Sequence, residues 1–350
     1  MTSKIFMEEA AALLVKAGHH ESFELSPLTG GVNNRIFLIR SDNRIIAVLK
    51  QYYHRKDNLR NRLSSDYGFS QFLWNHGVHQ IPMPLAADPN HHLALFSYID
   101  GKKMIPSEIT KQHIDQVLDF YFAINSFRAA EDAGILPKAS EACFSLAEHI
   151  RLTENRVRRL QKITGLSETD KKAERFIQDE LLPIWEQVKY TARQKAESNN
   201  LILDERIPES DMRLSPSDFG FHNALADEDG KLYFMDFEYA GWDDPAKMVC
   251  DLFCQPQIPI PPQCYSYITE KVVSDLSNPE MHRQRIGMLL PVYKIKWCCI
   301  ILNEFLPMGR SRREFMKKML NPEVNKADQL QKAMLVIKII VDGDERYAGN

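Results

Sequence analysis

The chain has 350 residues, of which 44% are hydrophobic and 26% are charged. These proportions are typical of a soluble globular protein with two domains or one bilobal unit, and they exclude a disordered or fibrous chain. The formal net charge of −3 provides no general attraction for nucleic acid or an anionic membrane, so neither is expected as a partner.

The cysteines and the apolar segments favour a cytoplasmic protein. Six cysteines in a chain of this size do not resemble a secreted disulfide framework, and the adjacent Cys298 and Cys299 suit buried free thiols. Glu8 and Glu9 interrupt the only early apolar run, which argues against a secretory signal. The most apolar late segment, 297–302, is far shorter than the roughly 20 residues of a membrane span.

The first hundred residues predict a small lobe that is rich in strands. The expected elements are a helix over 5–17, strands over 35–40 and 45–53, a helix over 56–76 and a strand over 92–99. Gly18 is expected to end the first helix, and residues 41–43 to form a hairpin-like turn between the first two strands.

The remainder is expected to be mainly helical. Apolar residues recur at helical spacing for about ninety residues from position 107, and the same period returns after residue 264. Between these stretches, a turn at 227–230 and the apolar run 231–237 predict one strand. The pattern predicts an α+β chain with a small lobe at 1–100, a mainly helical lobe at 101–350 and a hinge at about 96–101.

Two runs rich in basic residues, 54–62 and 309–318, stand out against the near-neutral chain. The first lacks the aromatic interleaving that is typical of nucleic-acid sites. We interpret both runs as solvated helix faces.

The stretch 217–223, SDFGFHN, contains the letters DFG, which mark the metal-binding aspartate of protein kinases. Phosphoryl transfer of that kind needs one aspartate that orients the attacking hydroxyl, an asparagine five residues later, and a second aspartate that holds Mg²⁺. Asn223 lies five residues after Asp218, and Asp236 follows at the end of the predicted strand. The spacing predicts Asp218 as the catalytic residue, with Asn223 and Asp236 as Mg²⁺ ligands. Alternatively, Asp236 caps a helix or a turn and Asn223 fills an ordinary loop.

The small lobe offers the other parts of a nucleotide site in the expected order. Gly30 and Gly31 would let backbone N–H groups approach phosphate oxygens, although a plain hairpin turn explains them equally well. Lys50, near the end of a strand, is placed to pair with the phosphates, and Asp66 on the next helix is the acid available to orient it. The alternatives are a solvent-facing lysine and an exposed helix acid.

With these elements in this order, the chain resembles the aminoglycoside phosphotransferase and choline kinase superfamily over roughly residues 25–255. The resemblance is most specific in 215–253, where the matching positions are Asp218, Asn223, Asp236, Gly241, Asp244, Pro245 and Asp251. It implies a bilobal protein-kinase-like fold and a phosphotransferase that uses Mg²⁺ with ATP or GTP. It also implies that the backbone of Ser97, Tyr98 and Ile99 binds the adenine edge.

Two positions depart from the family pattern. Pro216 stands where the family has a histidine that braces the loop, and it would brace the loop by fixing φ. Asp66 stands in place of a glutamate. Because aspartate is one methylene shorter, its pair with Lys50 is expected to be longer or bridged by water.

The acceptor is expected to be a small molecule. Only fourteen residues separate Asp236 from Asp251, which leaves no room for the segment on which protein kinases bind peptides. The hydroxylated acceptor is a sugar, an amino alcohol or an aminoglycoside, bound between the catalytic loop and the helical C-terminal region. The candidate contacts are Glu238, Tyr239, Trp242, Asp243, Tyr293 and Trp297. Aromatic residues at helical spacing more often belong to a core than to a substrate site, which applies to Tyr293 and Trp297.

Two competing interpretations stay open from the sequence. One is a non-catalytic relative that binds a nucleotide, and the other, less favoured, is a protein kinase. The protein is expected to be a monomer or a homodimer.

Overall fold

The protein is described from a computed structural model, which covers residues 4–28, 34–54, 61–165, 167–306 and 322–342. The chain forms two compact units, each made from two stretches of sequence. Unit 1 comprises residues 1–140 and 214–242, and unit 2 comprises residues 141–213 and 243–350.

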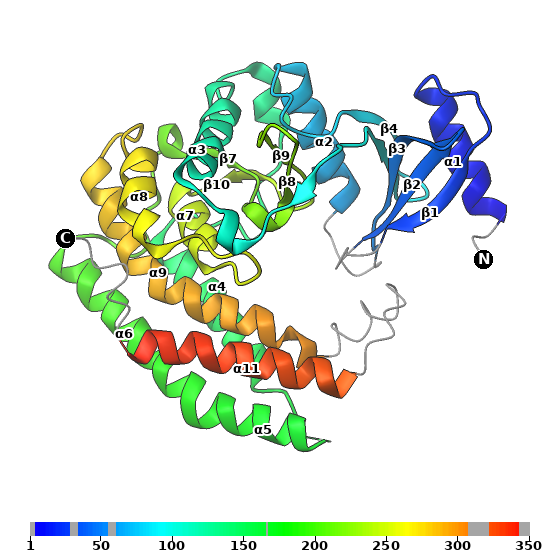
Figure 1. Ribbon diagram of the computed structural model, residues 1–350. Coiled ribbons are helices and arrows are strands. Elements are labelled where there is room, and N and C mark those ends of the chain that lie inside the picture. Colours follow the sequence, from blue (N-terminus) through cyan, green and yellow to red (C-terminus); the bar gives the residue numbers. More distant parts are fainter. Residues whose placement is uncertain (1–3, 29–33, 55–60, 166, 307–321, 343–350) are drawn as a thin grey trace. The chain divides into compact units, whose positions relative to one another are not determined.

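In its described residues, unit 1 contains a sheet, three longer helices and a set of short strands (Figure 1). Its elements are α1 (Lys4–Lys16), β1 (Glu24–Leu28), β2 (Arg35–Ser41), β3 (Arg44–Gln51), α2 (Arg62–Asn75), β4 (Pro84–Asp88), β5 (Leu93–Phe96), β6 (Lys102–Lys103), α3 (Lys111–Ser126), β8 (Ala224–Ala226) and β9 (Leu232–Phe234). Two further strands, β7 (Arg213–Ser215) and β10 (Gly241–Asp243), pair with each other where the chain passes from one unit to the other.

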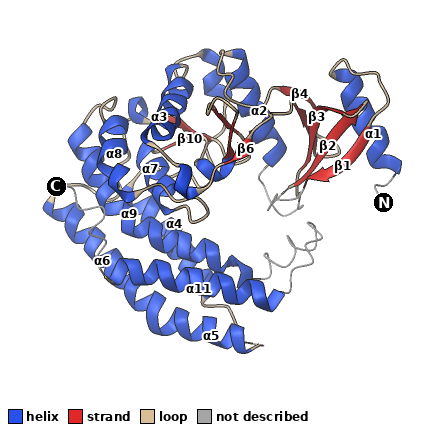
Figure 2. Ribbon diagram, viewed as in Figure 1, coloured by secondary structure: helices blue, strands red, loops and turns tan. Residues whose placement is uncertain are grey.

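The N-terminal sheet is antiparallel, with the strand order β1-β2-β3-β5-β4. Successive side chains of a strand point to opposite faces, and β5 uses both faces. Leu93 and Leu95 join the core under α1, whereas Ala94 and Phe96 join a cluster with Tyr52 and with α2. Covering both faces with helices explains why all of β5 is buried (Figure 2).

The predicted elements of this region are found, with shifted ends. The turn between β2 and β3 places Asp42 at φ 47° and Asn43 at φ 64°, the left-handed pair that a tight hairpin requires. Strand pairing, which the sequence pattern did not indicate, adds β1 and β4. Of the helix expected over 56–76, residues 55–60 lie outside the described part, and α2 begins at Arg62.

The solvated helix face expected over 54–62 is wrong for Arg62. This residue is only 5% exposed, although it begins α2 and follows the N-cap Asn61. Burial occurs because Arg62 faces Glu238, a contact across 176 positions that no local pattern contains. The second basic run, 309–318, lies outside the described residues.

Unit 2 is built from helices in its described part. These are α4 (Leu146–Leu160), α5 (Glu168–Phe176), a π-helical turn (Ile177–Leu181), α6 (Leu182–Ser198), α7 (Pro245–Cys254), α8 (Tyr265–Val273), α9 (Pro279–Ile301) and α11 (Pro322–Val341). The central helix α9 packs against α4, α6, α7, α8 and α11 (Figure 1). Trp185, Ile295, Cys298 and Ile337 lie in the shared core.

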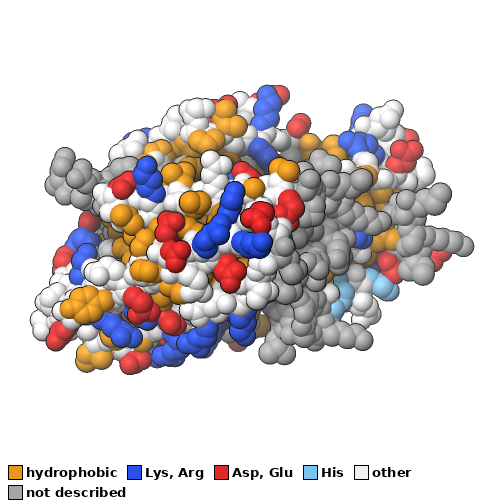
Figure 3. Space-filling view, turned by 90° about the horizontal axis from the view of Figure 1, so that it is seen from below, with side chains coloured by type: hydrophobic (Ala, Val, Ile, Leu, Met, Phe, Trp, Pro, Cys, Tyr) orange, Lys and Arg blue, Asp and Glu red, His pale blue; other side chains and the backbone are white. Residues whose placement is uncertain are grey.

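One segment, Pro279–Phe305, is long and apolar enough to cross a membrane by length and composition. However, 67% of its most apolar window is buried inside the structure, as in the core helix of a soluble protein. All six cysteines are free, and four of them are buried. On the face shown in Figure 3, the described acidic and basic side chains are intermixed.

The structure confirms the predicted α+β class, with an antiparallel sheet near the N-terminus and a mainly helical remainder. The compact units are composed differently from the predicted lobes, because residues 214–242 belong to the same unit as the N-terminal sheet. The division into lobes at about Gly101 stays a prediction.

The close approach of Gly241 to the backbone of residues 137–139 can be tested by substitution. Its φ of +151° lies in the region that favours glycine, and an added Cβ would lie 2.2 Å from the carbonyl oxygen of Pro137. We expect Gly241→Ala to lower the free energy of unfolding by about 2–4 kcal/mol, from backbone strain and overpacking. Gly68→Ala, inside α2 with open space around it, is the matched control and should stabilise slightly. Thermal unfolding that ranked the two variants equally would contradict this account.

Candidate active site

Lys50 lies at the centre of a buried cluster in unit 1. It is the penultimate residue of β3 and is only 8% exposed. Its Nζ donates to Asp66 Oδ2 at 2.5 Å and to Asp236 Oδ1 at 2.6 Å. The strand, α2 and the segment after β9 therefore converge on one ammonium group. A buried lysine needs such partners because an unpaired charge is costly away from water.

Asp66 connects all three segments. Its Oδ2 accepts hydrogen bonds from Lys50 and from the Tyr52 hydroxyl, at 2.7 Å for the latter. Its Oδ1 accepts a hydrogen bond of 2.8 Å from the backbone N–H of Phe237, next to Asp236. The expected longer or water-bridged pair with Lys50 is not what the structure shows. The ion pair is direct because Tyr52 and Phe237 hold the shorter carboxylate against the lysine.

The charges in this cluster perturb one another strongly. Burial alone would lower the pKa of Lys50, but the carboxylates of Asp236 and Asp66 outweigh it and raise that pKa. Burial raises the pKa of Asp236 to about 7, with Glu238 adding to the effect and Lys50 opposing it. Removal from water is the main cause of this rise, although the Asp236 side chain is 29% exposed, and the neighbouring acids Glu238 and Asp66 add to it.

Two residues of the cluster have unusual backbone conformations. Ser217, which precedes Asp218, has φ 68°, and Asp236 itself has φ 71°. A non-glycine residue in this region costs on the order of 1–3 kcal/mol, and such residues gather at functional sites. In this part of the chain, positive φ therefore occurs beside Asp218 and at Asp236, the two aspartates that the spacing selected.

A cluster of aromatic rings packs against the two segments that carry Asp218 and Asp236. Phe219 adjoins Asp218, Phe237 adjoins Asp236, and both rings pack against Phe120 of α3, with centroids 5.9 and 6.2 Å away. Phe234 of β9 stacks on the same ring at 4.4 Å. Offset and tilted arrangements of this kind add to the stability gained from burial. Helix α3 therefore fixes both acidic segments at once.

The predicted catalytic loop is held by its own side chains. Asn223 donates its amide N–H to the Asp218 carbonyl at 2.9 Å, which leaves Asn223 Oδ1 directed away from that carbonyl. The backbone N–H of Met235 donates to the Asn223 carbonyl at 3.0 Å and ties the loop to the segment that carries Asp236. His222 Nε2 lies 3.0 Å from Asp218 Oδ1, so a histidine braces the aspartate although Pro216 replaces the family's own.

The other predicted nucleotide contacts are the two glycines and residues 97–99, of which the second group is not part of the Lys50 cluster. Gly30 and Gly31 lie outside the described residues. Ser97 follows β5, and its N–H donates to the Met83 carbonyl while its hydroxyl accepts from the Met83 N–H. Tyr98 is partly exposed, and among the described residues none forms a hydrogen bond with the backbone of Tyr98 or Ile99.

The candidate acceptor contacts fall into both units. In unit 1, Glu238 is fully buried and binds Asn34, whereas Tyr239 and Trp242 are half-buried. In unit 2, Asp243 and Tyr293 are fully buried, and half-buried Trp297 donates its Nε1–H to Asp251. These residues stay predictions as acceptor contacts.

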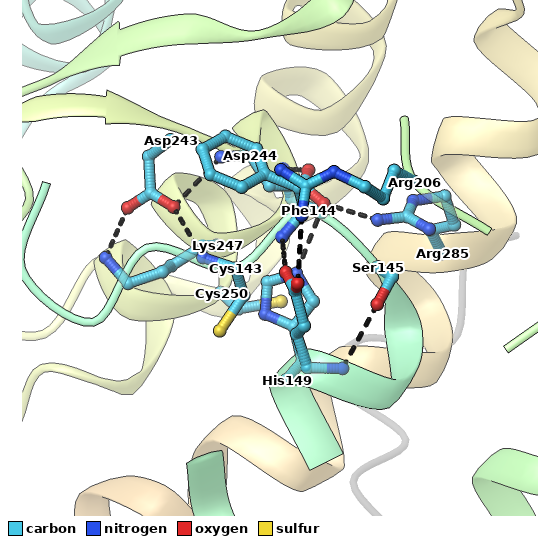
Figure 4. A network of polar contacts seen from close by, with 12 residues as sticks. Cys143, Phe144, Ser145, His149, Arg206, Asp243, Asp244, Lys247, Cys250 and Arg285 are labelled. Carbon is cyan, nitrogen blue, oxygen red and sulfur yellow. Dashed lines mark hydrogen bonds and ion pairs between the residues drawn. The ribbon is translucent and has the colours of Figure 1, made fainter. Parts of the chain in front are cut away.

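Sequence reasoning missed a buried charge network in unit 2 (Figure 4). Figure 4 shows His149 of α4 and Arg285 of α9 directed at Asp244, which is the N-cap of α7. The neighbouring Asp243 pairs with Lys247 at 2.5 Å. Burial alone would raise the pKa of Asp244, but Arg285 holds it well below its usual range. The network positions the start of α7, immediately after the segment that ends unit 1.

The fold and the site together define a kinase-like phosphotransferase: a lysine on a strand, an acid on the following helix, and two acidic loops after a helical segment. The chain belongs to the phosphotransferase enzyme family (APH), whose family model matches residues 24–254. This match confirms the resemblance that the sequence indicated and supports a small-molecule phosphotransferase. A comparison with curated protein sequences gave no match.

Solved structures share this fold. A choline kinase from Cryptosporidium parvum Iowa II is 12% identical, with coverage of 91% of this chain and 90% of that chain and a TM-score of 0.54. Choline kinase LicA from Streptococcus pneumoniae is 16% identical, with coverage of 96% and 98% and a TM-score of 0.54. A spectinomycin phosphotransferase, APH(9)-Ia, in complex with ADP and spectinomycin, is 12% identical, with coverage of 94% and 98% and a TM-score of 0.60. At these identities, the likeness shows the kinase-like fold alone.

The unit 2 network predicts unequal effects for two arginines of α9. Arg285→Met leaves the buried Asp244 without its main partner and should lower the free energy of unfolding by about 3–5 kcal/mol. Arg283→Met removes exposed pairs with Glu270 and Glu280, and should cost less than about 1 kcal/mol. Urea unfolding of both variants measures the difference. Equal losses would show that Asp244 does not depend on Arg285.

Proposed function

We propose that the protein transfers the γ-phosphate of ATP or GTP to a hydroxyl group of a small molecule and requires Mg²⁺. The observation that carries this proposal is the direct contact of Lys50 with both Asp66 and Asp236, in the same unit as the Asp218 loop. Membership of the phosphotransferase family supports the reaction class, and the nucleotide-bound relative supports the donor class.

The residues present fit a divalent cation of the Mg²⁺ type, which prefers oxygen ligands. Among the described residues, Asn223 Oδ1 and Asp236 Oδ2 form no hydrogen bond or ion pair, and each belongs to a side chain whose other polar atom is already bound. When bound, the cation supplies charge neutralisation for the phosphates.

Asp218 would accept the proton of the acceptor hydroxyl, or orient that hydroxyl for attack. Its side chain is 31% exposed, so an incoming hydroxyl can reach it, and His222 fixes one of its oxygens. Lys50 would bind phosphate oxygens, with Asp66 holding its side chain in place.

The backbone at Ser97, Tyr98 and Ile99 would bind the adenine edge. The N–H of Ser97 is already used by Met83, so its carbonyl and the groups of Tyr98 and Ile99 are the available partners. ATP and GTP present different edges to the same backbone, and a comparison of their affinities decides the donor.

The acceptor belongs to the group of sugars, amino alcohols and aminoglycosides. Among the solved structures of this fold are choline kinases and aminoglycoside phosphotransferases, so both classes belong in a screen. Nucleotide consumption with amino alcohols, aminoglycosides and free sugars would identify the class. Tight Mg·ATP binding without consumption on any class would favour the non-catalytic alternative. We further propose a cytoplasmic monomer or homodimer.

Asp218→Asn tests the catalytic assignment. The substitution keeps the size of the side chain but removes the proton acceptor, so we expect kcat to fall by roughly 10²–10⁴-fold. Affinity for Mg·ATP should stay within about threefold, because the phosphates are held by other residues. Full turnover of an acceptor that the wild type phosphorylates would overturn the role of Asp218.

Asp236→Ala tests the metal assignment. Loss of this carboxylate should remove most of the Mg²⁺-dependent gain in ATP affinity, at least roughly tenfold by calorimetry. Titrations in the presence of EDTA serve as the control, since the variant and the wild type should then differ little. An unchanged affinity for Mg·ATP would count against Asp236 as a ligand.

A further inference from the structure

Arg62 is a buried arginine with unsatisfied donors. Its side chain is 5% exposed, and its Nη1 lies 3.5 Å from Glu238 Oε1, too far for a normal hydrogen bond. Both Nε and Nη1 are buried and form no hydrogen bond. Leaving such charged donors unpaired away from water costs free energy, so a buried guanidinium group in this state indicates a missing partner.

The surroundings hold the guanidinium group without saturating it. Glu238 is fully buried, and its Oε2 accepts a hydrogen bond of 2.7 Å from Asn34. The Tyr239 ring lies beside the arginine, with its centroid 5.7 Å from Cζ. The ion pair and the aromatic contact fix the position of Arg62. The side-chain oxygen Oδ1 of Asn34 is also buried and forms no hydrogen bond.

Arg62 lies on the same side of unit 1 as the Lys50 cluster. It precedes Asp66 by four residues on α2, so the two side chains share one face of the helix. Asp66 binds Lys50 directly. Glu238 follows Asp236 by two residues, and Asp236 is the second partner of Lys50. Arg62 is therefore linked, through α2 and through the segment 236–238, to both partners of the lysine that the proposed function assigns to phosphate.

We propose that Arg62 is a second phosphate-binding cation, whose free N–H groups donate to phosphate oxygens of the bound nucleotide. The inference rests on the proposed function, since it needs a nucleotide at this site. A guanidinium group suits this role because its planar set of donors matches two oxygens of one phosphate. Glu238 and Tyr239 act as positioning residues for Arg62. The opposing explanation is that Arg62 only neutralises Glu238.

Nucleotide affinities measured by calorimetry separate these explanations. The proteins are the wild type, Arg62→Gln, Glu238→Gln and the double variant, titrated with ATP, ADP and AMP in Mg²⁺ and again in EDTA. Arg44→Gln is the charge-matched control, because Arg44 is exposed and lies six residues along β3 from Lys50, about 20 Å away. Melting temperatures report on folding.

Arg62→Gln should weaken ATP and ADP binding about 10- to 100-fold, the size of one or two charge-assisted hydrogen bonds, and AMP binding less than about threefold. The double variant should likewise bind ATP about 10- to 100-fold more weakly than Glu238→Gln does. Arg44→Gln should match the wild type. Because the double variant buries no unpaired carboxylate, it decides the question even if Arg62→Gln fails to fold.

Equal ATP affinities for Glu238→Gln and the double variant would overturn the inference and leave Arg62 as a neutralising residue. A loss for AMP as large as that for ATP would also overturn it, because the effect would not follow the phosphates. A wild-type protein that binds neither ATP nor GTP would instead overturn the proposed function itself.

Discussion

The burial of Lys50 is the constraint on which the rest of unit 1 depends. An ammonium group that is cut off from water stays charged only where carboxylates compensate for the lost solvation, and here Asp66 and Asp236 do so. Those two acids come from a helix and from a segment 170 positions further along the chain. The ion pairs therefore hold the sheet, α2 and the acidic loop in one arrangement. Breaking either pair would leave an unpaired charge buried in the protein interior.

This arrangement also explains why strain is tolerated beside the two aspartates. Ser217 and Asp236 adopt positive φ, which the backbone avoids unless the surroundings over-determine it. The surroundings here are the Phe120 ring of α3, against which Phe219 and Phe237 pack, and the Asp66 carboxylate, which accepts a hydrogen bond from the N–H of Phe237. Packing of these rings thus holds both aspartate segments in place.

Much of the site was predictable because its parts are short-range patterns. The spacing of Asp218, Asn223 and Asp236 is local, and so are the strand that carries Lys50 and the turn at Asp42 and Asn43. The order of these parts along the chain was enough to indicate the family, which the family match confirms. Helix α3 was equally readable, because its apolar stripe repeats at helical spacing.

What could not be predicted depends on contacts between distant segments. Strands β1 and β4 are defined by their partners rather than by a strong pattern of their own, and β1 contains Pro27. Arg62 sits in a basic run whose composition favours a solvated face, yet it is buried against Glu238. Tyr52 and Phe237 hold Asp66 in direct contact with Lys50. The expectation of a longer pair considered only that aspartate is shorter than glutamate, and so it missed these two contacts.

The buried charges of unit 2 limit how the Asp243 carboxylate could bind a small-molecule acceptor. Its carboxylate is fully buried, pairs with Lys247 and accepts a hydrogen bond from the N–H of Cys143. Burial raises the pKa of Asp243, so the removal of Lys247 from it would favour the protonated acid rather than a free carboxylate. A cationic acceptor would have to displace that lysine and also replace its charge. The half-buried Trp297, whose ring nitrogen alone is committed to Asp251, needs no such rearrangement to present its ring. Of these two predicted acceptor contacts, Trp297 would therefore need the smaller change in its own contacts.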